Sequence, residues 1–151
     1  MKSKLTLLIL ALTASFALAH GGVEIGPKGG RILEFSKNET MHGEVTAKDG
    51  KFQITLLDKD MKPLPVTSQF LTATSGTGAK PMKLDVERTD AGFAIPLIKE
   101  GQMLILQYRE TENAKPVTAR FKYDTSNCDA CDNPEWLCKC EANKAAAKKE
   151  K

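Results

Sequence analysis

The sequence lacks cysteine over most of its length. All four cysteines fall between positions 128 and 140, so the body of the chain must fold without disulfides. Aromatic residues make up only 6% of the sequence, with Trp136 as the one tryptophan. We therefore expect a core of modest size that consists mainly of aliphatic side chains.

Neither sign of charge is in large excess. The 22 Lys and Arg residues stand against 19 Asp and Glu residues, which gives a formal net charge of +3. Removal of the first residues, with Lys2 and Lys4, lowers this charge to +1. Such a chain has no overall field that attracts nucleic acid or anionic lipid, so we expect no nucleic-acid partner.

The one long apolar run, residues 5–16, is too short to anchor the chain stably in a bilayer. It follows a short basic stretch and precedes the small-residue box Ala17-Leu18-Ala19, a pattern typical of a secretory signal peptide. We predict that residues 1–19 are a signal peptide, which leaves 132 of the 151 residues as one exported domain. The predicted location is periplasmic or secreted, with no stable membrane insertion after cleavage.

Cleavage after Ala19 makes His20 the first residue of the mature chain. Its free amine and imidazole are then close enough to chelate one Cu(II) ion, for which imidazole is a preferred ligand. The alternative is that His20 is a solvated terminus with no ligand role. A chelate needs further ligands, and the candidates are His42, the only other histidine, and Met41 beside it.

A glycine-rich arm is expected at residues 20–30, because glycine disfavours helix. The segments 20–22 (His-Gly-Gly) and 26–34 (Gly-Pro-Lys-Gly-Gly-Arg-Ile-Leu-Glu) resemble a segment near the N-terminus of periplasmic membrane-fusion subunits of RND-type heavy-metal efflux systems. The chain is too short for the coiled-coil hairpin and lipoyl-type domain of that family. The resemblance therefore implies a metal-handling environment, with a heavy-metal efflux system as a candidate partner.

Residues 31–124 show alternating apolar and polar positions in short runs separated by turn signals. Asp49-Gly50 between two such runs predicts a hairpin. We expect residues 103–108 to form a central strand buried on both faces, and Pro96 to mark an edge strand. The pattern predicts an all-β fold, an antiparallel β-sandwich of about seven strands of the immunoglobulin-like type.

The chain resembles the small periplasmic copper proteins of the CopC type in its export, its size, its strand pattern and His20. The resemblance implies a β-sandwich that binds Cu(II) through its mature N-terminal histidine. The Asp-x-His motif of that family is missing here, so only His20 carries over.

The four cysteines, Cys128, Cys131, Cys138 and Cys140, form a Cys-x-x-Cys and a Cys-x-Cys pair, with Asp132-Asn133-Pro134 able to reverse the chain between them. Four thiolates in one loop can surround Cu(I) or Zn(II). They can equally form two disulfides between the pairs, since a bond across Cys-x-Cys is strained. Trp136 would shield either arrangement from water. The Lys- and Ala-rich residues 141–151 are expected to form a polar tail.

No catalytic constellation is visible. No Gly-x-Ser-x-Gly elbow occurs, and no βαβ unit accompanies the Cys-x-x-Cys pair. We therefore predict a monomeric, non-catalytic protein that binds a transition metal, with copper expected, for metal storage, delivery or resistance. The alternative is a non-catalytic envelope module that recognises a protein partner and whose C-terminal loop is stapled by disulfides.

Overall fold

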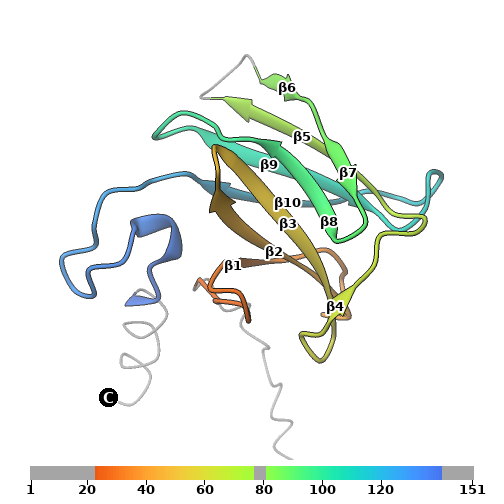
Figure 1. Cartoon of the computed structure of the whole chain (residues 1–151), viewed down its shortest axis with the longest axis horizontal. Helices are drawn as coiled ribbons and strands as arrows, with labels where there is room; N and C mark the ends of the chain where they lie inside the picture. Colours follow the sequence, from red (N-terminus) through yellow and green to blue (C-terminus); the bar gives the residue numbers. More distant parts are fainter. Residues whose placement is uncertain (1–22, 77–80, 141–151) are drawn as a thin grey trace, which may run out of the picture.

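The computed structural model describes residues 23–76 and 81–140. Within these ranges the chain forms ten β-strands and one 3-10 helix, η1 (Glu135–Leu137), and no helix there is long and apolar enough to cross a membrane. All strand pairs are antiparallel, and the strands form two sheets (Figure 1). The prediction of an all-β, antiparallel sandwich-like fold is confirmed. The predicted signal peptide, His20 and the tail lie outside the described residues.

The larger sheet has six strands and the smaller sheet has four. In spatial order the larger sheet contains β1 (Arg31–Glu34), β2 (Met41–Lys48), β3 (Lys51–Asp58), β8 (Gly92–Pro96) and β7 (Glu87–Thr89), with β4 (Pro63–Leu64) also paired to β3. The smaller sheet contains β10 (Val117–Lys122), β9 (Met103–Arg109), β5 (Phe70–Gly76) and β6 (Met82–Leu84).

The strand count exceeds the expected seven partly because one predicted strand changes sheets. Residues 82–87 alternate in the sequence and predict a single strand, but β6 pairs with β5 in the smaller sheet and β7 pairs with β8 in the larger one. The chain crosses between them at Asp85 and Val86. Alternation reports which side chains face the core and carries no information on which sheet receives the strand.

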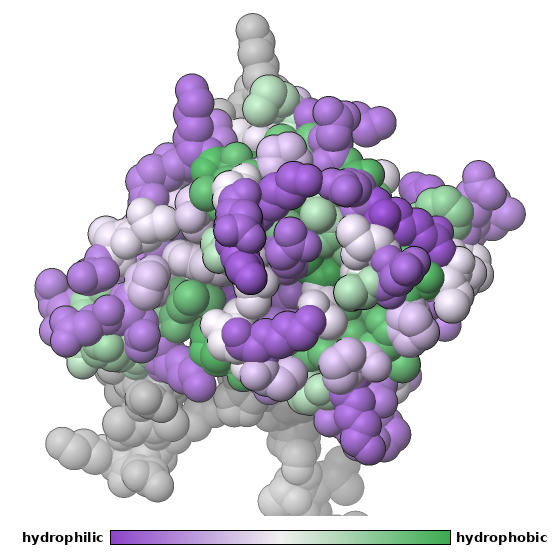
Figure 2. Space-filling view, in the orientation of Figure 1, coloured by the Kyte–Doolittle hydropathy of each residue, from purple (hydrophilic) through white to green (hydrophobic). Residues whose placement is uncertain are grey.

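The core lies between the two sheets and draws on the inward-facing residues of both. These are mainly aliphatic, as expected, and include Leu33, Val45, Ile54, Leu56 and Ile95 of the larger sheet and Leu71, Leu84, Leu104, Leu106 and Phe121 of the smaller one. The face of the molecule in Figure 2 is mainly hydrophilic, with hydrophobic residues showing mostly in the hollows between polar side chains.

Two sequence expectations about single strands need correction. β9 is central, between β10 and β5, but the residues between its buried Leu104, Leu106 and Tyr108 are half-buried or exposed. It is therefore buried on one face, as is usual in an antiparallel sheet. β8, which Pro96 closes, lies between β3 and β7 and is not an edge strand. Pro96 is tolerated because it is the last residue of the strand.

The predicted hairpin is confirmed in its register. Lys48 pairs with Lys51, and the two residues between them, Asp49 and Gly50, have φ angles of 52° and 73°. Positive φ at both central positions is the geometry of a type I′ turn, which matches the twist of the two strands. This local signal fixes β2 against β3 along their full length.

Residues 23–30 of the glycine-rich arm fold back on the outer face of the larger sheet. Glu44, fully buried on β2, accepts hydrogen bonds at Oε1 from the backbone N–H groups of Lys28 (2.6 Å) and Gly30 (3.0 Å). A Cβ at Gly26 would stand 2.6 Å from the Glu44 carboxylate carbon, so any larger residue there would displace the Glu44 side chain. The described part of the arm, residues 23–30, is irregular, as predicted, and one carboxylate holds it on the sheet.

Candidate metal centre

The four cysteines lie in the loop that follows β10. Cys128 donates its backbone N–H to the carbonyl oxygen of Asn133 at 2.8 Å, and Asn127 pairs with Pro134 in an isolated bridge. Asp132, at a φ of 55°, makes the reversal between them. The turn predicted at residues 132–134 therefore forms, and it returns the second cysteine pair toward the first.

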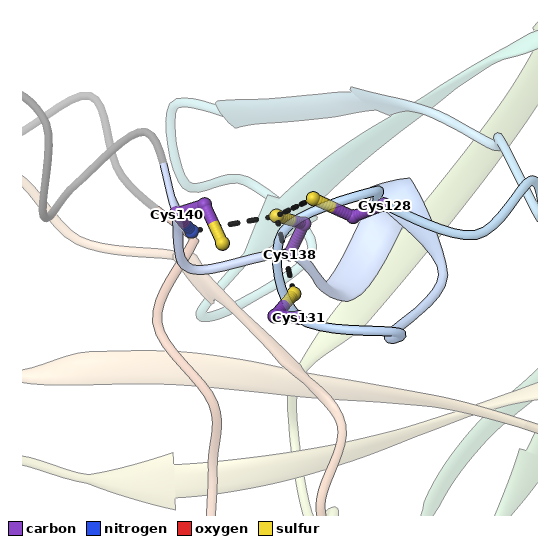
Figure 3. A group of neighbouring side chains, drawn as sticks. All are labelled: Cys128, Cys131, Cys138 and Cys140. Carbon is purple, nitrogen blue, oxygen red and sulfur yellow. Dashed lines mark hydrogen bonds between the residues drawn. The ribbon is translucent and has the colours of Figure 1, made fainter.

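The four sulfur atoms converge on one point (Figure 3). Cys138 Sγ is 3.2 Å from Cys128 Sγ and 3.7 Å from Cys131 Sγ. All four Sγ atoms lie within 4.8 Å of one another, and all four cysteines are free thiols. Among the described residues they are the only group of three or more His, Cys, Asp or Glu side chains placed to hold an ion.

These separations fit a tetrahedral thiolate site. With metal–sulfur bonds of about 2.3 Å, two sulfurs at the tetrahedral angle are about 3.8 Å apart. The measured contacts of 3.2 Å and 3.7 Å and the outer limit of 4.8 Å bracket that value. Small side-chain rotations would therefore bring the four ligands to a common ion.

Backbone N–H groups point at the sulfurs and favour thiolate. The N–H of Asn133 lowers the pKa of Cys131 to about 7, helped by the Cys140 thiol. The N–H of Ala130 also lowers the pKa of Cys128, but hydrogen bonding with Cys138 and burial outweigh it and raise the pKa overall. Hydrogen bonding with Cys131, and then with Cys138, raises the pKa of Cys140 to about 12. The lowered pKa makes Cys131 the cysteine that forms a thiolate more readily than Cys128 or Cys140.

The cysteines differ in their access to solvent. Cys128 and Cys138, which we call the inner pair, are 8% and 5% exposed. Cys131 and Cys140, which we call the outer pair, are half-buried. A reagent from solution therefore reaches the outer pair first.

Trp136 fixes the cysteine loop to the sandwich. It lies in η1, two residues before Cys138, and is 5% exposed. Its ring stacks on Phe121, with centroids 5.6 Å apart and planes at 19°, and meets Phe52 and Tyr123 edge to face. Because these rings belong to the hydrophobic core, the loop is packed as part of the sandwich.

Arg31 contacts the backbone of the same tryptophan. Its Nη1 donates a 2.9 Å hydrogen bond to the carbonyl oxygen of Trp136, and its guanidinium lies 5.3 Å from the centroid of the Phe121 ring. Burial lowers the pKa of Arg31 from its usual value, without removing its charge at neutral pH. The first strand is thereby tied to the cysteine loop.

A second set of polar contacts holds the start of the loop. Asp124 accepts hydrogen bonds from the hydroxyl and N–H of Ser126 and pairs with Lys122 at 3.0 Å. The Ser126 hydroxyl, followed by Lys122, lowers the pKa of Asp124 to about 2. Glu100 accepts from both the N–H and the hydroxyl of Thr125. The chain therefore leaves β10 in one fixed direction.

Beside the centre is an open cavity of about 320 Å³. Two cationic side chains, two carboxylates and one of the cysteines line it. The lining residues are Val23, Arg31, Lys122, Asp124, Glu135, Trp136 and Cys138. Val23, where the described chain begins, therefore lies next to the cysteine loop.

The histidine and methionine candidates do not join this centre. Met41 packs against the core, whereas His42, buried on the opposite face of β2, contacts Glu34 through Nδ1 at 2.6 Å. Adjacent strand residues point to opposite faces, so the two side chains do not converge on one ion. His20 lies outside the described residues.

Sequence reasoning identified the four cysteines and missed the residues that position them. Asp124 has a local signal, because an Asp two residues before a Ser is typical of an Asx turn. Arg31 has none, since its partner Trp136 is 105 residues away in the sequence.

Comparison with known proteins identified no relative. No family model, no curated protein and no solved structure matches the chain. The resemblances to efflux subunits and to CopC-type proteins stay predictions.

Proposed function

We propose that this chain is a non-catalytic, exported metal-binding protein whose four-cysteine loop holds one transition metal ion. The observation that carries the proposal is the convergence of the sulfurs of Cys128, Cys131, Cys138 and Cys140 within 4.8 Å. Four thiolates at this spacing match the tetrahedral coordination of a soft or borderline ion. The N–H groups of Ala130 and Asn133 supply part of the charge compensation that clustered thiolates need.

Copper is the cargo we propose, bound as Cu(I) in the cysteine loop, with storage, delivery or resistance in the periplasm as the role. Thiolates select Cu(I) and Zn(II) over harder ions, and a closed four-sulfur set is also the common form of a structural zinc site. Zn(II) is therefore the competing ion. His20, with its amine and imidazole, is proposed as a separate Cu(II) ligand.

The test is metal analysis of the mature protein purified under reducing, anaerobic conditions. We expect one ion per chain, and retention of Cu(I) over Zn(II) when both are offered in equal amounts. Cys138→Ser should abolish stoichiometric binding, whereas Lys139→Ala, which changes the exposed residue between Cys138 and Cys140, should preserve it.

The metal content distinguishes a copper site, a structural zinc site and a disulfide-stapled module. Retention of Zn(II) in place of copper would assign the loop a structural zinc ion and refute the copper role. No metal uptake, together with no free thiols in protein prepared without reductant, would refute the metal function and favour a disulfide-stapled interaction module. If the chain is such a module, Cys138→Ser should have no effect on its metal content.

A further inference from the structure

We propose that the four-cysteine loop is also a thiol–disulfide site that oxidises to one defined pair of disulfides, Cys131–Cys140 first and Cys128–Cys138 second, and that the first bond releases the ion. The release of metal rests on the proposed function. The pairing rests only on the arrangement of the sulfur atoms, so it can be tested on metal-free protein.

The structure selects among the three pairings that four cysteines allow. Pairing within each motif requires a bond between Cys138 and Cys140 across a single residue, which is strained. Of the two remaining pairings, one joins Cys138 to Cys128 and the other joins it to Cys131. Cys138 Sγ is closer to Cys128 Sγ, at 3.2 Å against 3.7 Å. Joining Cys138 to Cys128 leaves Cys131 and Cys140 for the second bond, and their Sγ atoms lie within 4.8 Å of each other.

Exposure sets the order in which the bonds form. The inner pair is 8% and 5% exposed, and Cys138 directly follows η1, whose Trp136 is packed in the core. The outer pair is half-buried and open to a reagent from solution. Because thiol–disulfide exchange requires in-line access to sulfur, the outer pair reacts first.

The chemistry needs an oxidant that is itself a disulfide, and oxidised glutathione is the probe. The Cys131 thiolate attacks one sulfur of oxidised glutathione, which forms a mixed disulfide and releases one glutathione thiolate. The Cys140 thiolate then attacks the Cys131 sulfur, which forms the Cys131–Cys140 disulfide and releases the second glutathione thiolate. Two electrons pass from the two cysteines to glutathione, and the ion loses two of its four ligands.

The sequence allows each cysteine to be placed on its own peptide. Trypsin cleaves after Lys122 and Lys139, and a protease specific for the N-terminal side of aspartate cleaves before Asp124, Asp129 and Asp132. The resulting fragments 124–128, 129–131, 132–139 and 140–144 carry one cysteine each. Any disulfide therefore joins two identifiable peptides in a non-reducing digest.

The experiment uses the full mature chain loaded with Zn(II) and treated with oxidised glutathione. Released zinc is followed with a chromogenic chelator, and samples are alkylated, digested and analysed by mass spectrometry. We expect the peptide of Cys131 joined to that of Cys140, in step with loss of zinc, before Cys128 is joined to Cys138. In the metal-free chain, Cys140→Ser should remove the early disulfide, whereas Cys138→Ser should retain it.

Other outcomes overturn the inference. These are a bond between Cys131 and Cys138, a statistical mixture, formation of the inner bond first, or zinc release that precedes any disulfide. If the protein takes up neither Zn(II) nor Cu(I), the metal function fails, and the same digest of the metal-free chain still decides the pairing and its order.

Discussion

The carbonyl oxygen of Trp136 accepts a 2.9 Å hydrogen bond from Nη1 of Arg31, so the loop that carries the four cysteines is tied to the first strand of the sandwich. Because Trp136 also packs among core rings, the conformation of the cysteine loop and the stability of the sandwich are coupled.

Trp136→Ala should cost about 3–5 kcal/mol in the free energy of unfolding, the usual loss for a large aromatic side chain removed from a core. Urea denaturation followed by far-UV circular dichroism measures it. Phe70→Ala is the control, because Phe70 is 41% exposed and its loss should cost little. Equal effects of the two substitutions would show that Trp136 does not anchor the loop.

Removal of the metal should loosen Trp136 from its ring contacts. Since it is the only tryptophan, its fluorescence reports on the cysteine loop alone. We expect a strong chelator to shift the emission to longer wavelength and to lower the melting temperature, because an ion that binds only the folded loop stabilises it. Unchanged emission in metal-stripped protein would mean that the loop stays docked without an ion.

Asp124 should make the loop sensitive to acid. Its pKa in the folded chain is held at about 2 by the Ser126 hydroxyl and by Lys122, below the ordinary value of 3.8. A depressed pKa contributes stability that is present above the ordinary pKa and is lost as the pH falls toward 2. The stability difference between the native protein and Asp124→Asn should therefore shrink between pH 4 and pH 2.

Thermal melts across that range measure the difference. Asp90→Asn, in the exposed turn between β7 and β8, serves as the control. A stability difference for Asp124→Asn that stays constant across the range would show that its carboxylate is not responsible.

Glu44→Ala should detach the glycine-rich arm from the larger sheet. The backbone N–H groups of Lys28 and Gly30 would lose their shared acceptor, at a cost of roughly 2–4 kcal/mol in the free energy of unfolding. Glu44→Gln keeps an oxygen in place and should cost less. Limited proteolysis near residue 28 provides a second measurement, and resistance equal to that of the native chain would contradict the arrangement.

One added residue ahead of His20 should abolish the proposed terminal copper chelate, because the amine and the imidazole no longer belong to the same residue. The expected result is loss of nitrogen-rich Cu(II) coordination in the electron paramagnetic resonance spectrum. Replacement of His42 by Asn is the comparison, since its Nδ1 already contacts Glu34. Identical spectra for the extended and native chains would exclude His20 as a ligand.

What the sequence predicts well in this protein is local. The Asp49-Gly50 turn and the alternation beside it fix the β2–β3 hairpin, and the cysteine loop closes because its two motifs are separated by a turn. The sheet assignments of β6 and β7 depend on contacts that alternation does not encode. The contact of Arg31 with Trp136 joins opposite ends of the described chain, and no local sequence pattern predicts it.

The packing of Trp136 against Phe52, Phe121 and Tyr123 has a practical consequence for protein engineering. A version truncated after Tyr123 would expose these three aromatic rings at one end of the sandwich and would be prone to aggregate. Grafting only residues 128–140 onto a carrier protein would transfer the cysteines without the aromatic rings that Trp136 packs against. The smallest unit suited to expression therefore keeps the cysteine segment and the strands together.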